Sequence, residues 1–135
     1  MDPLEKIVNN DKFAKLVGVR LLNVSEGYAA AELTITDNHL NGLGIAHGGA
    51  VFTLADLVFA AASNSRGAEA VAININISYF KAERSGTLTA EAKEISLNRK
   101  LATYLITVRN DTGQQIAAMQ GTAFRKPPKQ RRAQL

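Results

Sequence analysis

The stretch that decides the fold runs from Gly48 to Ser65 and consists of the residues GGAVFTLADLVFAAASNS. At 3.6 residues per turn, its apolar side chains point in every direction around the helix axis, which predicts a helix buried on all sides. A helix of this kind needs other elements to cover it. The sequence on both sides of the stretch predicts strands, so we expect a long antiparallel sheet wrapped around a central helix.

The strand pattern is clearest in residues 71–79, where large apolar residues alternate with Ala, Asn and Ser. This period of two predicts a strand with two unlike faces. Similar runs, separated by turns rich in Ser, Asn, Asp and Gly, predict strands at 19–24, 28–35, 87–95, 101–109 and 115–124. Residues 3–17 have helical spacing and end at Gly18, which predicts one amphipathic N-terminal helix. Together these elements predict a single α+β domain over residues 1–124.

Composition excludes several classes of protein. The chain has 135 residues, 46% of them hydrophobic and 21% charged, which suits one globular domain. It contains no cysteine, so a disulfide scaffold and a thiol nucleophile are excluded, and with only two histidines we expect no metal site. No apolar run reaches the roughly 20 residues that cross a membrane, and the first residues do not resemble a signal peptide. We therefore expect a cytoplasmic protein that does not bind membranes.

The net charge of +4 comes from the C-terminal end of the chain. Five Lys and Arg residues lie within residues 125–135, and without them the net charge is −1. No aromatic residues are interleaved with these charges, as base stacking would require, so we expect no nucleic-acid partner. We expect residues 125–135 to form a basic, disordered tail, with an electrostatic arm as the alternative.

Asp56 is the only formally charged residue between Asp37 and Arg66. It lies too far inside the predicted helix to act as an N-cap, and Arg66 is about 15 Å further along the axis. Burying an unpaired carboxylate costs several kcal/mol, so such a group shifts its pKa or finds a partner. We interpret Asp56 as a catalytic carboxylate. The alternative is a structural one, hydrogen-bonded to a backbone amide or to Thr53, or paired with a distant cation.

The helical neighbours of Asp56 predict a narrow pocket. They are bulky on the flanks and small or hydroxylated along the centre, and comprise Gly49, Phe52, Thr53, Phe59, Ala60 and Ser63. Such a pocket would admit an aryl or a medium-chain acyl group. Among these neighbours we take Gly49 and Thr53 as substrate-binding residues.

His47, Gly48 and Gly49 stand at the start of the helix, where the first amides have no intrahelical partner. Those amides, the helix dipole and the access that glycine allows suit a developing oxyanion. Gly48 and Asp56 are about 12 Å apart along the axis, whereas both would have to lie about 3 Å from one reacting centre. Two antiparallel copies across a two-fold axis remove that conflict, which predicts an obligate homodimer if the two residues cooperate.

Three segments together resemble a known family: NGLGIAHGG at 41–49, Leu54-Ala55-Asp56, and ASNSRG at 62–67. They are similar to the phenylacetic-acid-degradation (PaaI) thioesterases of the hotdog superfamily, with a likeness that extends from about Phe13 to Phe124. The motif places an Asn six residues before the His and an acid eight residues after the first Gly of the pair. The resemblance implies the hotdog fold, a homodimer that forms the active sites, and commonly a homotetramer.

The resemblance also implies the activity and the catalytic residues. The chain would be an acyl-CoA thioesterase in which the Gly48 amide is the oxyanion donor and His47 shapes the turn. Asn41 would help to hold the water or the thioester. Asp56 of the facing subunit would act as general base or as nucleophile, and the sequence leaves this choice open.

Coenzyme A contacts are implied by the resemblance at Asn74, at Tyr79 and at the turn of Asn98, Arg99 and Lys100, whose cations suit the nucleotide phosphates. Coenzyme A is part of the substrate, so no separate cofactor is expected. Two other functions remain open: a hotdog dehydratase or hydratase, and a non-catalytic acyl-CoA-binding protein. The sequence does not identify the acyl or aryl group.

Overall fold

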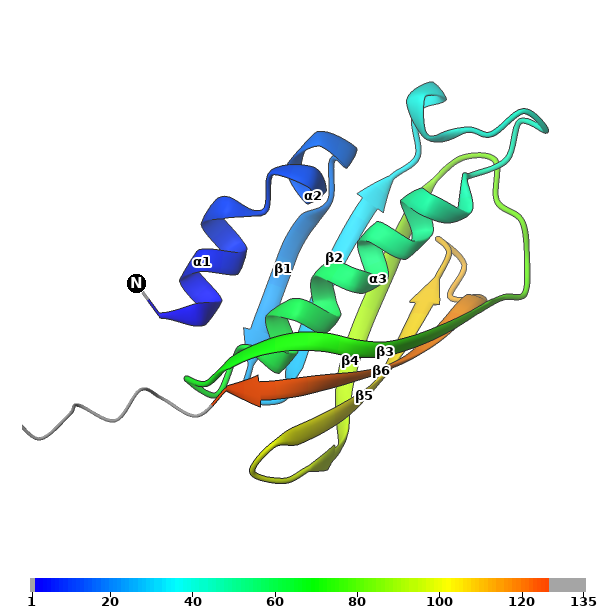
Figure 1. Ribbon diagram of the computed structural model, residues 1–135. Helices are drawn as coiled ribbons and strands as arrows, with labels where there is room; N and C mark the ends of the chain where they lie inside the picture. Colours follow the sequence, from blue (N-terminus) through cyan, green and yellow to red (C-terminus); the bar gives the residue numbers. More distant parts are fainter. Residues whose placement is uncertain (1, 127–135) are drawn as a thin grey trace, which may run out of the picture.

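This computed structural model describes residues 2–126, which form one six-stranded antiparallel sheet with a long helix across its concave face (Figure 1). The strands are β1 (Arg20–Ser25), β2 (Tyr28–Thr34), β3 (Glu69–Tyr79), β4 (Thr87–Leu97), β5 (Leu101–Arg109) and β6 (Gln115–Lys126). The helices are α1 (Pro3–Asn10), α2 (Lys12–Val17), the short 3-10 helix η1 (Asp37–His39) and α3 (Gly48–Ser63). The strand order is β1-β2-β4-β5-β6-β3. The predicted α+β arrangement, a long antiparallel sheet around a central helix, is confirmed.

Helix α3 packs onto the sheet through a close fit between Phe59 and Gly121. A β-carbon placed on Gly121 of β6 would lie 2.9 Å from the Phe59 ring, so only glycine leaves room for this contact. The Phe59 ring also contacts Tyr104 of β5, with 5.8 Å between ring centroids. The helix ends two residues earlier than predicted because the Asn64 side chain bonds to the backbone of Ala60 and Ala70.

The prediction that α3 is buried on all sides is wrong in one respect. A stripe of Gly49, Phe52, Asp56 and Ala60 remains exposed or half-buried within the single chain, and we call it the open stripe. Phe59, which the sequence placed along the pocket, is 2% exposed and belongs to the core. Helical periodicity reports which residues avoid water, and it does not separate burial within one chain from burial against another molecule.

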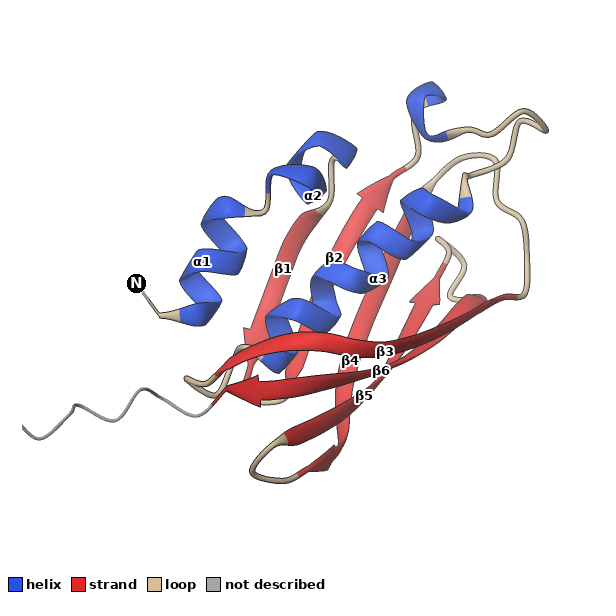
Figure 2. Ribbon diagram, viewed as in Figure 1, coloured by secondary structure: helices blue, strands red, loops and turns tan. Residues whose placement is uncertain are grey.

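The N-terminal segment forms two helices instead of the one predicted, as Figure 2 shows. Asp11 interrupts the helix with a non-helical backbone and caps α2, its Oδ1 accepting the Ala14 N–H at 2.9 Å. Leu4, Ile7 and Val17 of the two helices pack against the core. Asp and Asn favour such cap positions because the side chain replaces a missing intrahelical acceptor.

Strand β3 lies at one edge of the sheet and contains a bulge that the alternation concealed. Pairing with β6 shifts between Ala72 and Asn74, so Ile73 has no residue opposite it. After the bulge Asn74 pairs with Thr122, on the face turned away from α3, whereas Ile75 pairs with Gly121 on the α3 face. The bulge therefore divides the apolar residues of β3 between two faces.

The last strand runs two residues past the predicted domain boundary at Phe124. The Arg125 N–H donates to the Lys100 carbonyl at 2.7 Å, and Lys126 forms an ion pair with Glu69 at 3.8 Å. Residues 127–135, the remainder of the predicted tail, lie outside the described residues. Within residues 2–126, none of the helices is long and apolar enough to cross a membrane.

Candidate active site

The first turn of α3 is held by three side chains. His47 is the N-cap, and its Nδ1 accepts the Gly49 N–H at 2.8 Å. The Thr53 hydroxyl donates to the Gly49 carbonyl at 2.7 Å, and the Tyr79 hydroxyl donates to the Gly48 carbonyl at 2.9 Å. Within residues 2–126, the Gly48 N–H is left without an acceptor. It is therefore a free backbone donor at the positive end of the helix dipole.

A cavity of about 370 Å³ opens beside this amide, between the loop before α3 and the end of β3. Gly48, Asn41 and Tyr79 line it. The side-chain oxygen of Asn41, Oδ1, accepts the backbone N–H groups of Leu43 (2.9 Å) and Ile45 (3.3 Å), so this atom shapes the loop. Only the amide nitrogen of Asn41 is left to face a ligand.

The loop after β3 forms the other wall of this cavity and is tied to the first loop. The Ala46 N–H donates to the Glu83 carbonyl at 2.7 Å, and Arg84 donates to the Gly44 carbonyl at 3.3 Å. The Glu83 carboxylate accepts from Asn110 at 2.6 Å and from Lys81 at 3.0 Å. The hydrogen bond from Asn110 holds the pKa of Glu83 below its usual value. Sequence reasoning missed Glu83 and Asn110 because their contact joins two distant turns.

Asp56 lies on the open stripe, two turns along the helix from Gly48. Within residues 2–126 its carboxylate makes no hydrogen bond or ion pair, and Thr53 donates to the Gly49 carbonyl instead. Burial raises the pKa of Asp56, and the negative charge of Asp11 raises it further. A half-buried carboxylate without a partner accepts a proton more readily than an ordinary Asp. The structural alternatives considered for Asp56 therefore find no partner in the described residues.

A second cavity, of about 530 Å³, lies on the α2 side of the same helix turn. His47, Gly49 and Thr53 line it together with Phe13 and Leu16 of α2. Phe13 and Leu16 are 63% and 81% exposed, so these apolar side chains are not used in the core. The sequence predicted one amphipathic helix over residues 3–17, and the break at Asp11 is the signal that would have separated Phe13 and Leu16 from its first part.

Two sets of sequence-predicted residues lie away from these cavities. Asn98, Arg99 and Lys100 form the turn between β4 and β5, which Figure 1 shows at the opposite end of the molecule from the start of α3. The Asn98 side chain accepts the backbone N–H groups of Lys100 and Leu101 and so shapes that turn. Asn74 lies on the face turned away from α3. One chain therefore unites Asn41, His47, Gly48, Gly49, Thr53 and Tyr79, and leaves Asp56, Asn74 and the 98–100 turn apart from them.

The described part of the chain contains no cluster of three or more His, Asp or Glu side chains that could hold a metal ion. The single chain offers a free amide with a cavity on either side of its helix turn and, two turns further along α3, a carboxylate with a raised pKa. Such a set can stabilise an oxyanion and accept a proton.

Comparison with known proteins shows a consistent likeness. The family model of the thioesterase superfamily matches residues 43–117. A putative esterase of Archaeoglobus fulgidus is 48% identical over 117 residues, which cover 86% of this chain and 76% of that protein. The acyl-coenzyme A thioesterase PaaI of Escherichia coli is 36% identical over 117 residues, which cover 86% of this chain and 84% of that protein. The predicted resemblance to the PaaI thioesterases is confirmed.

Solved structures agree. The E. coli PaaI structure superposes with a TM-score of 0.88 at 33% identity, covering 93% of this chain and 91% of that one. A Streptococcus mutans protein whose crystal structure holds acetyl CoA superposes with a TM-score of 0.77 at 28% identity, covering 81% of this chain and 89% of that one.

Proposed function

This chain belongs to the thioesterase superfamily and is a thioester hydrolase, and on that premise we propose that it hydrolyses an aryl- or medium-chain acyl-coenzyme A to the free acid and coenzyme A. The name of the E. coli relative and the acetyl CoA in the S. mutans neighbour support coenzyme A as the thiol part of the substrate. The apolar cavity beside Phe13 and Leu16 supports a bulky acyl part. The reaction needs no cofactor, because coenzyme A is itself part of the substrate. The cytoplasmic location expected from the sequence stays a prediction.

The proposed reaction uses the free amide and the free carboxylate. The Gly48 N–H donates to the thioester carbonyl oxygen as negative charge develops there. Asp56 either accepts a proton from the attacking water or attacks the carbonyl carbon itself, in which case water then cleaves the resulting anhydride. In both routes the carbon–sulfur bond breaks, and the thiolate of coenzyme A leaves. Asn41, through its amide nitrogen, would help to hold the water or the thioester.

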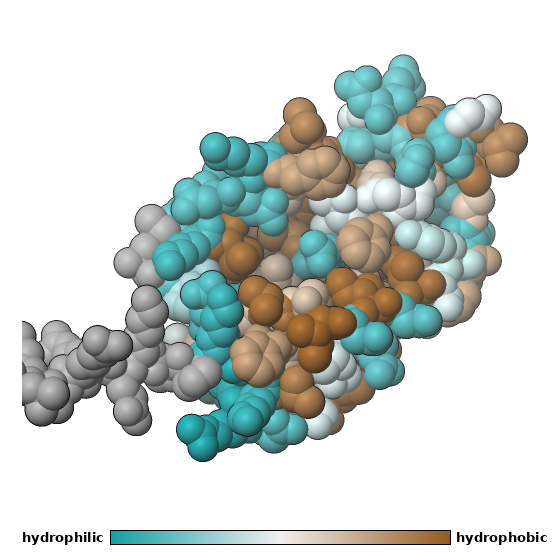
Figure 3. Space-filling view, in the orientation of Figure 1, coloured by the Kyte–Doolittle hydropathy of each residue, from teal (hydrophilic) through white to brown (hydrophobic). Residues whose placement is uncertain are grey.

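We propose that the two groups come from different copies of the chain. Gly48 and Asp56 lie eight residues apart on one helix, about 12 Å along its axis, so one copy does not bring both to one carbonyl. On the edge strand β3, Ile75 and Ile77 lie on the α3 face and are only partly buried, and Figure 3 shows hydrophobic surface gathered over β3 and the adjoining face of α3. A partner on this face would cover the open stripe and complete two equivalent sites per dimer.

The same antiparallel pairing would bring the second set of predicted residues closer. The 98–100 turn lies near the C-terminal end of α3 in its own chain, and a two-fold axis across α3 moves the partner's copy toward Gly48. This supports Arg99 and Lys100 as phosphate contacts. A homotetramer would use a further surface, for which the exposed Leu101, Leu105 and Phe124 on the outer face of the sheet are candidates.

One contact counts against the dehydratase alternative. His47 Nδ1 accepts the Gly49 N–H, so the neutral imidazole carries its proton on Nε2. A dehydratase needs a His that accepts a proton at the substrate, and this arrangement leaves no basic nitrogen for that task. The unpartnered Asp56 carboxylate is the observation that carries the hydrolase proposal, because it supplies the base that hydrolysis requires.

The test measures thiol release from a panel of aryl- and alkyl-CoA esters, with the wild type, Asp56→Asn and a matched control. Asp37→Asn is that control, since Asp37 is an exposed carboxylate whose side chain makes no hydrogen bond in the described chain. We expect Asp56→Asn to lower kcat by at least about 10²-fold while Asp37→Asn stays at the wild-type level. Full activity in a folded Asp56→Asn enzyme would remove Asp56 from the mechanism. Binding of the esters without any thiol release would identify an acyl-CoA-binding protein instead.

A further inference from the structure

We propose that Tyr79 is a positioning residue for the oxyanion donor, holding the first turn of α3 so that the Gly48 N–H points at the thioester carbonyl. The inference rests on the proposed function, because the direction of that amide matters only if a thioester reacts beside it. It assigns to Tyr79 a role through the protein backbone, whereas the resemblance implies a coenzyme A contact.

The contact between Tyr79 and the helix start is close and involves the ring as well as the hydroxyl. The hydroxyl donates to the Gly48 carbonyl at 2.9 Å. A β-carbon placed on Gly48 would lie 3.3 Å from both the Tyr79 hydroxyl oxygen and the carbon that carries it, so the ring end lies against the Gly48 backbone. The same residues line one cavity.

The position of Tyr79 in the sheet makes this contact independent of the helix. Tyr79 is the last residue of β3 and pairs with Ala117 of β6, whereas Gly48 is the first residue of α3. The other two contacts on the turn, from His47 and Thr53, come from the helix or its cap and move with it. Tyr79 is thus the member of the three that fixes the helix start relative to the sheet.

The phenol is suited to this task over the whole working pH range. About half of the Tyr79 surface is exposed, at 51%, but burial of its hydroxyl end raises the pKa of the phenol above its usual value of 10.0. The hydroxyl therefore stays protonated and continues to donate. Oxyanion donors act through preorganisation, so a small displacement of the amide lowers the rate without preventing binding.

The experiment compares Tyr79→Phe with Tyr28→Phe in full-length enzyme, by steady-state hydrolysis of the best CoA ester in the panel. Tyr28 is a matched control because its hydroxyl also makes one hydrogen bond, to Glu91 at 2.6 Å, with a residue that lines neither cavity. We expect Tyr79→Phe to lower kcat about tenfold with KM within about twofold of wild type, and Tyr28→Phe to change neither. A raised KM with an unchanged kcat would overturn the proposal and restore the coenzyme A contact.

A double-mutant cycle tests whether Tyr79 acts through the amide. Gly48→Pro removes the N–H at the first helical position, where proline is tolerated, and the His47 ψ of 135° suits a residue before proline. Its β-carbon would lie 3.3 Å from the Tyr79 hydroxyl, so Gly48→Ala, which adds the same β-carbon and keeps the N–H, is the matched control. We expect Tyr79→Phe to have no further effect on kcat in the Gly48→Pro background, because the donor that it positions is gone. Additive losses would overturn the proposal, as would a fall in melting temperature large enough to account for the lost activity. Failure of the proposed function is distinguishable, since the wild type would then release no thiol from any ester.

Discussion

At the scale of single residues, Gly48 and Asp56 differ in how they are held. Three side chains from two elements fix the turn that contains Gly48, and they leave its N–H free. Asp56 has no hydrogen-bonding partner in the described chain, and its surroundings act on it only through burial and the charge of Asp11. Hydrogen bonds therefore fix the position of the Gly48 N–H, whereas burial and a nearby charge set the pKa of the Asp56 carboxyl.

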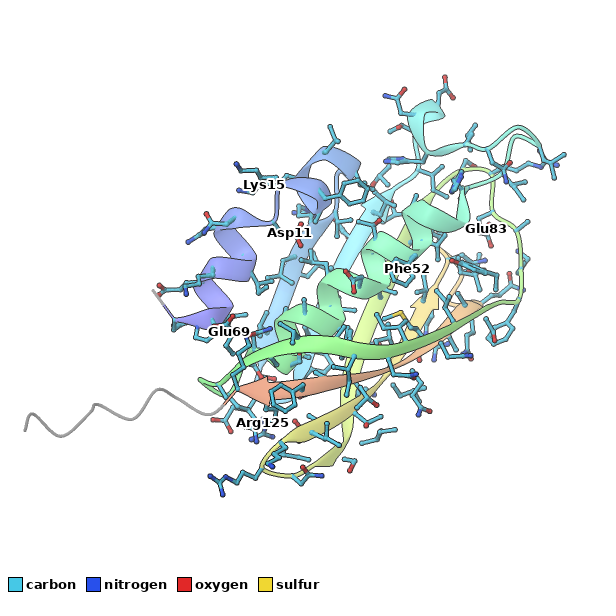
Figure 4. The ribbon with its side chains drawn as sticks, in the orientation of Figure 1. Asp11, Lys15, Phe52, Glu69, Glu83 and Arg125 are labelled. Atoms are coloured by element: carbon cyan, nitrogen blue, oxygen red, sulfur yellow. The ribbon has the colours of Figure 1, made fainter. Side chains whose placement is uncertain are left out.

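The charge of Asp11 predicts a change in the pH profile. Asp11 shares a cavity wall with Leu57, the neighbour of Asp56, and Figure 4 places it on the side of the N-terminal helices that faces α3. Asp56 must be ionised to act, so activity rises as pH rises through its pKa, and the raised pKa puts that limb above the usual Asp value of 3.8.

We expect Asp11→Asn to move this acid limb of kcat/KM to lower pH, because the substitution removes the like charge and still provides an N-cap for α2. Activity at the plateau should stay unchanged. The measurement is a pH profile at low salt, with Asp37→Asn as the control, since Asp37 does not contribute to the shift at Asp56. An acid limb that stays in place, or one that moves equally in both variants, would contradict the role of Asp11.

At the scale of elements, the seating of α3 on the sheet depends on one absent side chain. A β-carbon on Gly121 would lie only 2.9 Å from the nearest atoms of the Phe59 ring, which is too close for a side chain at this position. Phe59 lies about three turns along α3 from Gly48 and less than one turn from Asp56, and its contact with Gly121 sets the height of the helix above the sheet. The close approach of helix and strand is therefore a condition for the geometry at Gly48.

We expect Gly121→Ala to destabilise the fold by about 1–3 kcal/mol, because the added methyl group overpacks a closed contact. Gly42→Ala is the matched control, since a β-carbon there meets nothing within 4 Å and its φ is not positive. Urea unfolding monitored by circular dichroism measures both variants. Equal midpoints for Gly121→Ala and Gly42→Ala would show that the sheet yields to the helix and that the close fit does not limit stability.

At the scale of the whole molecule, the single chain presents an incomplete site. Figure 1 shows α3 crossing the sheet with its open side free, and β3 with an unpaired edge. The free amide lies at one end of α3 and the free carboxylate in its middle. A second copy that pairs across a two-fold axis is the arrangement that would unite them.

Subunit complementation tests this arrangement. Gly48→Pro and Asp56→Asn should each be nearly inactive alone, but a mixture refolded in equal amounts should recover roughly a quarter of wild-type activity, since one site in four combines an intact Gly48 with an intact Asp56. Thiol release before and after refolding the mixture measures the recovery. An unchanged, near-zero rate in a mixture that forms mixed dimers would place both groups in one subunit. Full activity in monomers would exclude a shared site.

Much of the fold could be predicted because it depends on local patterns. The apolar run at 48–65 gave the central helix, and alternation gave the strands, one of them, Leu101–Arg109, with its ends as observed. Two of the departures arose where a single residue acts against the pattern: Asp11 caps a new helix and ends the old one, and Ile73 bulges out of β3. Periodicity averages over a window, so it conceals such interruptions.

The sequence by itself determined which groups are chemically conspicuous: one carboxylate in an apolar helix, and one glycine pair at its start. These follow from residue type and spacing along the chain. Only the tertiary structure decided that Asp56 lacks a partner, that His47 and Tyr79 hold the helix start, and that the 98–100 turn lies at the far end from Gly48. Each of these depends on contacts between residues distant in sequence, and such contacts are fixed by how helix and sheet pack and by no local pattern.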